Sequence, residues 1–251
     1  MISALDVALL VLAGVAAGLV GSAGGITSLI SFPALLAVGL PAHAANVANS
    51  VGLVACLPGS AHASRPELRG RGAWLKRWSA VAAIGGTAGA VLLLVTPDDV
   101  FARVVPFLVA AGSLALLFEP RLTAWHRQRE GTNALALPAG ILALALYNGY
   151  FGAGSGVMTL TLMLVLVDDH LPTANALKNV LIGVGSVATA TILVLAGPVE
   201  WAATVPIAAG LLVGSRIGPV VARRLPPDLL RVLIVVFGLA LAVDLWINPS
   251  T

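Results

Sequence analysis

Long apolar runs follow one another along almost the whole chain, separated only by short stretches rich in Gly, Pro or charge. A helix that spans a bilayer needs about 20 mostly apolar residues, whereas a membrane β-barrel would alternate apolar and polar residues over segments of about ten. Only 10% of the 251 residues are charged, against about a quarter in a soluble domain. The sequence therefore excludes a soluble globular protein and predicts an all-α polytopic membrane protein.

The apolar runs divide into ten segments where Gly, Pro or charged residues interrupt them. The second and the seventh are short for a full crossing, and the second also contains Pro33. Each of these two follows a Gly-rich break. The ten segments cover residues 4–20, 26–40, 43–63, 74–95, 99–118, 132–149, 157–167, 172–196, 199–221 and 227–247.

The two halves of the chain share a pattern of residues at a nearly constant spacing. Residues 18–25 align with 149–156 at an offset of 131, with three glycines in register, and 45–46 align with 174–175 at an offset of 129. A shared order at a constant offset indicates a duplication of five segments plus five segments. We therefore expect a first repeat at 1–118, a cytoplasmic linker loop at 119–131 and a second repeat at 132–251.

Basic residues predict how the repeats are oriented. Ten of the fourteen Lys and Arg residues lie in three clusters beside apolar runs, within 65–77, 121–129 and 223–224. Such clusters are typical of cytoplasmic loops, so the net charge of +3 does not indicate nucleic-acid binding. The basic loop at 65–77 corresponds to a loop at 196–201 that has no base. Equivalent loops thus fall on opposite sides, which predicts inverted repeats with basic loops in the cytoplasm and both termini outside.

The Gly-rich breaks are the first candidate substrate site. Inverted repeats with interrupted helices are typical of secondary transporters, in which the site lies between the repeats. A helix that begins inside the membrane presents free N–H groups to an anion, and glycine lets the backbone approach a ligand closely. Close helix packing is the alternative, as for the ridge at 210–218. The candidates are Gly21, Ser22, Gly24, Gly25, Gly152, Gly154, Ser155 and Gly156, with further hydroxyl groups at Thr27, Ser28 and Thr159.

Two polar clusters follow the short segments, and buried polar residues in a membrane are candidates for function. The first is Asn46 and Asn49, and the second is Asn175, Lys178 and Asn179. Lys178 either supplies a charge for an anion or extends to the membrane interface. The sequence leaves both interpretations open.

The sequence around the breaks resembles a known family. The stretch Tyr147–Gly156 with Ala176–Asn179, and Ala17–Gly25 with Phe32–Leu35, are similar to the two motifs of the TauE/SafE family of sulfite exporters, also called toluene-sulfonate uptake permeases. The resemblance covers essentially the whole chain. It implies a transporter of sulfite, sulfoacetate or other small organosulfur anions in the bacterial inner membrane.

This chain departs from the family pattern in its first half. The opening loop has Ser22–Ala23 before only two consecutive glycines, and Ala48–Asn49 stands where a Thr-Asn-Lys-like element is common. We therefore expect the first half to contribute less positive charge to the site than is usual.

The resulting hypothesis is a secondary transporter that exports small sulfur-containing anions by alternating access. A passive anion channel is the main alternative, and an intramembrane enzyme is weaker because Ser155 has no helix-borne His near it in the sequence. Neither a metal-ligand pattern nor a phosphate loop is present, so we expect no metal and no cofactor. Membrane lipids are expected partners. The sequence leaves open a proton relay at Asp168–His170 and a homodimer.

Overall fold

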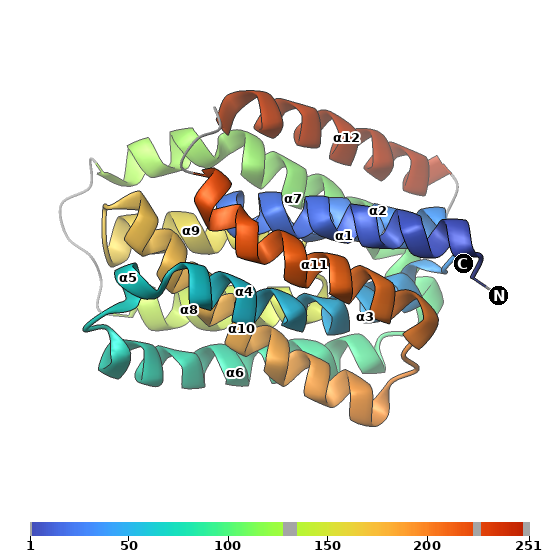
Figure 1. Cartoon of the computed structure of the whole chain (residues 1–251), viewed down its shortest axis with the longest axis horizontal. Coiled ribbons are helices and arrows are strands. Elements are labelled where there is room, and N and C mark those ends of the chain that lie inside the picture. Colours follow the sequence, from blue (N-terminus) through green and yellow to red (C-terminus); the bar gives the residue numbers. More distant parts are fainter. Residues whose placement is uncertain (1, 128–134, 223–226, 248–251) are drawn as a thin grey trace.

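The computed structural model describes residues 2–127, 135–222 and 227–247, and all regular structure in these ranges is helical (Figure 1). The elements of the first half are α1 (Ala4–Gly24), α2 (Ser28–Ala37), α3 (Ala42–Gly52), η1 (Leu53–Ala55), α4 (Cys56–Ala63), α5 (Arg65–Leu68), α6 (Gly72–Val95) and α7 (Asp98–Arg127). Those of the second half are α8 (Ala136–Tyr150), α9 (Ser155–Leu166), α10 (Leu171–Ala196), α11 (Trp201–Ala222) and α12 (Pro227–Ile247).

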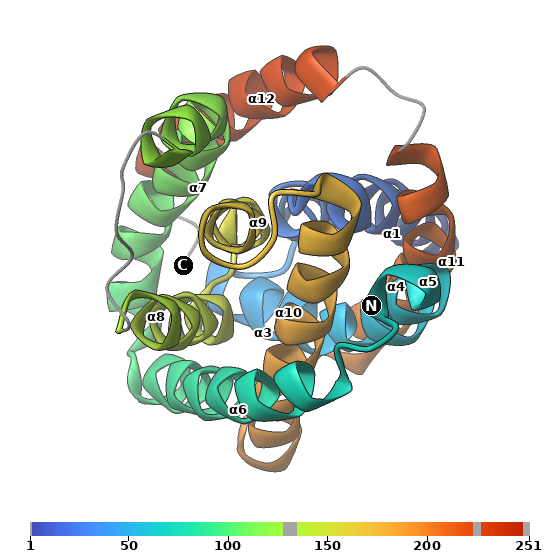
Figure 2. The same ribbon diagram turned by 90° about the vertical axis from the view of Figure 1, so that its left-hand side faces the viewer.

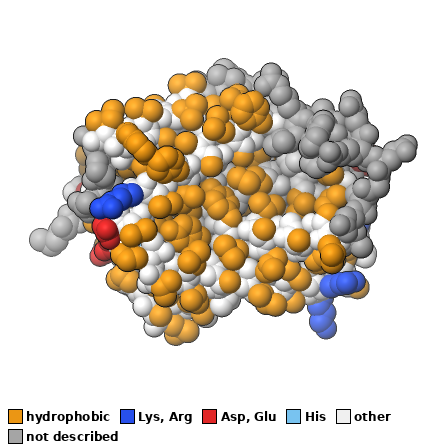
Figure 3. Space-filling model, turned by 180° about the vertical axis from the view of Figure 1, so that it is seen from behind, with side chains coloured by type: hydrophobic (Ala, Val, Ile, Leu, Met, Phe, Trp, Pro, Cys, Tyr) orange, Lys and Arg blue, Asp and Glu red, His pale blue; other side chains and the backbone are white. Residues whose placement is uncertain are grey.

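Length and surface composition identify a membrane protein. Four of the described helices, α1, α6, α10 and the 201–218 part of α11, are long and apolar enough to cross a membrane. Figure 3 shows the charged side chains of one face at its two ends, with a mainly apolar surface between them. The predicted all-α polytopic membrane protein is thereby confirmed.

The second helix of each half is short. With ten and twelve residues, α2 and α9 extend about 15 and 18 Å at 1.5 Å per residue, against about 30 Å for the hydrocarbon core of a bilayer. The breaks before them contain Gly25, Gly152 and Gly154, with φ values of 81°, 83° and 75°. Glycine adopts this left-handed backbone without steric strain, so the chain changes direction there.

Two segments differ from the sequence prediction. Helix α7 continues to Arg127, so residues 119–127 are helical and not part of a linker loop, and 128–131 lie outside the described residues. Charge marked the expected end of the apolar segment, but a helix can continue beyond the membrane into water. The third segment, 43–63, is divided into α3 and α4 by the 3₁₀ turn η1.

The helices pack through glycines, with partners exchanged between the halves. On α11, a Cβ on Gly210 or Gly214 would overlap the backbone of α1, and on α6 a Cβ on Gly85 or Gly89 would overlap the backbone of α8. Helix α6 of the first half thus packs on α8, the first helix of the second half, and α11 of the second half packs on α1, the first helix of the first half. This exchange fits two related repeats, and their inversion across the membrane stays a prediction.

The ends of the bundle carry the connections, and its centre holds the broken helices. Helix α1 begins and α12 ends at one end of the bundle, whereas α5, the start of α6 and the end of α7 lie at the other (Figure 1). Seen along the bundle, α3, α9 and α10 occupy the centre (Figure 2). Arg129, Arg223 and Arg224 lie outside the described residues. Which end faces the cytoplasm stays a prediction.

We expect Gly214→Val to destabilise the protein, because its side chain would overlap the carbonyl of Val15 on α1. Overpacking typically costs about 1–3 kcal/mol, and roughly 2–4 °C of melting temperature per kcal/mol is usual for a chain of this size. Thermal unfolding of the purified protein in detergent measures the shift. Ala16→Val, at an exposed position on α1, is the control, and equal melting temperatures for the two variants would contradict the packing.

Candidate functional site

The two Gly-rich breaks lie against each other inside the molecule. A Cβ on Gly25 would overlap the backbone of Gly156 and Val157, and a Cβ on Gly156 would overlap the backbone of Gly25. Only residues without a Cβ allow two backbones to come this close. The structure thus changes the reason for glycine at these two positions: the opposing backbone, and not a ligand, fills the space that a side chain would need.

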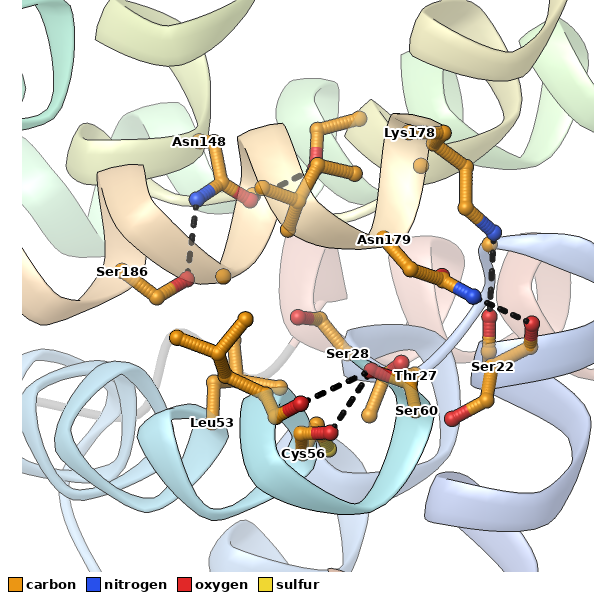
Figure 4. A pocket seen from close by; sticks show the side chains of 18 residues that line it. Ser22, Thr27, Ser28, Leu53, Cys56, Ser60, Asn148, Lys178, Asn179 and Ser186 are labelled. Atoms are coloured by element: carbon orange, nitrogen blue, oxygen red, sulfur yellow. Dashed lines mark hydrogen bonds between the residues drawn. The ribbon is translucent and has the colours of Figure 1, made fainter. Parts of the chain in front are cut away.

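A cavity of about 50 Å³ is lined by both breaks and by residues of α4 and α10 (Figure 4). Since one water needs roughly 10–15 Å³ on this measure, the cavity has room for a few waters or one small ion. Eight of the thirteen predicted site residues line it: Gly21, Ser22, Gly25, Gly152, Ser155, Gly156, Lys178 and Asn179. Of the three further hydroxyl candidates, Thr27 and Ser28 also line it and Thr159 does not.

The other five predicted residues do not line the cavity. Gly24 faces open space, and a Cβ on Gly154 would overlap Gly112 of α7, so Gly154 serves helix packing. The side chains of the three asparagines Asn46, Asn49 and Asn175 are hydrogen-bonded to neighbouring parts of the protein.

Three asparagines connect the halves of the chain crosswise. Asn175 and Asn179 donate from their Nδ2 atoms to the carbonyl oxygen of Ser22 on α1, at 3.0 and 3.1 Å. In the opposite sense, Asn46 donates to the carbonyl oxygen of Tyr150, the last residue of α8, at 2.8 Å. The final carbonyls of a helix lack partners within the helix. The asparagines of each half therefore donate to a backbone carbonyl near the C-terminal end of the first helix of the other half, which is α1 or α8.

Lys178 is the one charged side chain among the described residues that line the cavity. It is 1% exposed, and its Nζ atom lies 3.5 Å from the carbonyl oxygen of Gly21. No carboxylate of the described ranges lies within 4 Å of this nitrogen. Its burial excludes the interpretation that the side chain extends to the membrane interface.

Two cavity hydroxyl groups are held in place by asparagine amides. Ser28 accepts a hydrogen bond from Asn49 Nδ2 at 3.1 Å, and Ser186 accepts one from Asn148 Nδ2 at 3.3 Å. Neither hydroxyl donates to an acceptor within the described part of the chain. Both therefore keep an O–H group that can donate into the cavity.

Several lining residues were not predicted as site residues. Asn148 is one of them, and the others form two rows with the helical spacing i, i+3, i+4 and i+7. The first row is Leu53, Cys56, Leu57 and Ser60. The second row starts at the predicted Asn179 and adds Ile182, Gly183 and Ser186. Helical periodicity from Asn179 would have predicted the second row. Nothing in the sequence shows that Leu53 faces a polar cavity.

The candidate proton relay at Asp168–His170 and the ion pair of His43 lie away from the cavity. His43 Nδ1 is 3.3 Å from Asp98 Oδ1 at the start of α7, and Asp168 forms an ion pair with Arg71. None of these residues lines the cavity.

Comparisons with known proteins indicate a membrane transporter. The chain is 28% identical to the "Probable membrane transporter protein YfcA" of Escherichia coli (strain K12), over 98% of this chain and 91% of that protein. It is 27% identical to the "Probable membrane transporter protein" of Haemophilus influenzae, over 92% of this chain and 91% of that protein. No solved structure matches the chain.

The family comparison covers almost all of the sequence. The model described as "Sulfite exporter TauE/SafE" matches residues 8–245. With the apolar helices and the bacterial relatives, this match identifies an integral protein of the bacterial inner membrane. The chain therefore belongs to the TauE/SafE family of membrane transporters.

Proposed function

We propose that the protein is a secondary transporter that exports small sulfur-containing anions, such as sulfite or organosulfonates, by alternating access. The observation that carries this proposal is the buried ammonium group of Lys178 on the wall of the cavity between the two breaks. The description of its family as sulfite exporters supports the class of substrate.

The environment of Lys178 favours an anion in the cavity. An ammonium group without a counter-charge is costly in a region of low dielectric, and an anion would compensate it. A purely structural role at the negative end of the α1 dipole is the competing explanation. However, Asn175 and Asn179 already satisfy the nearby Ser22 carbonyl, and the 3.5 Å distance from Lys178 to Gly21 is long for a charged hydrogen bond.

Neutral donors around Lys178 suit an oxyanion. The free O–H groups of Ser28 and Ser186 can each donate to an anion oxygen, and α2 and α9 begin at the two breaks with the positive ends of their dipoles. One charge with several neutral donors can hold a small ion that carries several acceptor oxygens.

Alternating access would move the two halves against each other around this cavity. The crosswise hydrogen bonds of Asn46 and Asn175 couple the third segment of each half to the first helix of the other, so the breaks can move together with those segments. Export of an anion needs no ATP, since an inside-negative potential supplies about 2.3 kcal/mol per charge per 100 mV.

The rival functions differ in specific ways. An intramembrane serine hydrolase would need a base beside Ser155, but Ser155 Oγ donates to the amide oxygen of Asn148 at 2.7 Å. No histidine of the described ranges lines the cavity. A passive channel would share the polar lining of the cavity, so only the kinetics of transport distinguish it from a carrier.

Flux measurements in proteoliposomes test the transport class. We expect sulfite efflux to saturate with concentration and to accelerate when sulfite is also present on the other side. A carrier must bring its binding site back to the first side after each release, and this return is faster when the site carries substrate. An efflux rate that rises linearly with sulfite concentration and does not depend on sulfite on the opposite side would identify a channel. Absence of any sulfite or sulfonate flux, in protein that remains folded, would contradict the proposed function.

We expect Lys178→Met to weaken anion binding at least tenfold, because it removes the cavity's formal charge, and Lys178→Arg to retain part of the binding. Isothermal titration of purified protein with sulfite or methanesulfonate measures the affinities. Lys76→Met, at an exposed position on α6, is the matched control. Near-wild-type affinity of both Lys178 variants would support the purely structural role.

The hydroxyl groups give a separate expectation. Loss of a hydrogen bond to a charged group is worth about 1.5–3 kcal/mol, so Ser28→Ala and Ser186→Ala should each weaken binding roughly tenfold or more. Thr191→Val removes a hydroxyl group from the exposed side of α10 and should leave binding unchanged. Unaltered affinity in both serine variants would show that neither hydroxyl group contacts the anion.

A further inference from the structure

Four helix ends meet at the cavity, and their partial charges oppose one another. Helices α1 and α8 end at the breaks, while α2 and α9 begin there. A helix carries roughly half a positive charge at its N-terminus and half a negative charge at its C-terminus. Two ends of each sign therefore approximately cancel.

Formal charge on the wall comes from a single group. Of the eighteen lining residues, all in the described part of the chain, Lys178 is the one that carries charge, and the others are apolar, hydroxyl, amide, thiol or glycine residues. The first half supplies no second cation, because Asn49 occupies the position that aligns with Lys178 at the offset of 129. Asn49 is instead neutral and hydrogen-bonded to Ser28 and Ser31. The net charge around the cavity is therefore close to one positive unit.

From this balance we propose that the cavity selects monoanions, such as bisulfite or an alkanesulfonate, over dianions such as sulfate or fully ionised sulfite. This inference rests on the proposed function, because it concerns the charge of the same transported ion. A monoanion leaves the occupied cavity neutral. A dianion leaves one negative charge uncompensated in a buried region, where an unpaired charge is strongly disfavoured.

Binding of two ligands across a pH series tests the proposal. Sulfite changes from monoanion to dianion near neutral pH, whereas methanesulfonate remains a monoanion throughout. We expect the affinity for sulfite relative to methanesulfonate to fall as the pH rises from mildly acidic to mildly alkaline. Under this proposal both ligands bind as monoanions, so titration of a group on the protein changes both affinities by the same factor and cancels in the ratio. Sulfate should bind at least tenfold more weakly than methanesulfonate at every pH.

The outcomes separate this inference from the proposed function. If neither sulfite nor methanesulfonate binds, the proposed function fails, and the inference fails with it. If both bind but the ratio stays constant or rises with pH, or sulfate binds as well as methanesulfonate, only the selection of monoanions is overturned.

Cys56 allows the charge of the wall to be changed directly. It is the single cysteine of the chain, is partly exposed and lines the cavity. A thiosulfonate reagent would convert the Cys56 thiol into a mixed disulfide that carries an aminoethyl group, with release of a sulfinate, and would thereby add a second positive charge. The corresponding propyl reagent is a neutral control of similar size. After mass spectrometry confirms modification, the aminoethyl protein should gain affinity for sulfate relative to methanesulfonate. An equal ratio in the two modified proteins would contradict the charge balance.

Discussion

The contact between Gly25 and Gly156 is the constraint on which the centre of the structure depends. It brings the backbones of the two breaks closer than any side chain would allow. As a result, residues more than a hundred positions apart in the chain face one cavity. Phe32 of α2 and Phe151 of the second break also pack edge to face beside this region, with ring centroids 5.3 Å apart, so apolar packing supports the same arrangement.

Broken helices create a difficulty that the fold resolves with side chains from the opposite half. Backbone polar groups inside a membrane must find partners within the protein or in a water-filled cavity. Asn46, Asn175 and Asn179 supply partners for carbonyl groups near the ends of α8 and α1. These asparagines hold the breaks that shape the cavity, and their contribution to a substrate site is therefore mainly one of position.

Glycine has two different roles in this molecule. At Gly210, Gly214, Gly85 and Gly89 it permits helix axes to approach, as small residues do in membrane helices. At Gly25, Gly152 and Gly154 it permits a left-handed backbone, so α1 ends directly before Gly25, and α9 begins directly after Gly154. Gly156 combines close approach with a place on the cavity wall, although its backbone is helical. Glycine therefore allows the helices to pack closely, interrupts them at the breaks, and lets the two halves meet at Gly25 and Gly156.

Much of this architecture could be predicted from the sequence. Apolar run length determines that the chain is a helical membrane protein, and Gly-rich interruptions determine where α2 and α9 begin, because both are local properties of the chain. The two predicted Gly-rich breaks, with their serines, and the cluster around Lys178 likewise led to eight of the residues that line the cavity. By contrast, the continuation of α7 to Arg127 was not predicted, since hydropathy marks the membrane boundary and not the end of a helix.

Only the tertiary structure decided which polar residues share the cavity. Asn49 and Lys178 align at the offset of 129 between the two halves of the chain, yet Lys178 lines the cavity, whereas Asn49 does not line it and donates to Ser28. Ser186 follows Asn179 at helical spacing, but it reaches the wall only because α10 packs beside α8, which carries its partner Asn148. Local sequence determines where helices form and break, whereas the facing of a side chain depends on contacts between segments far apart in the chain.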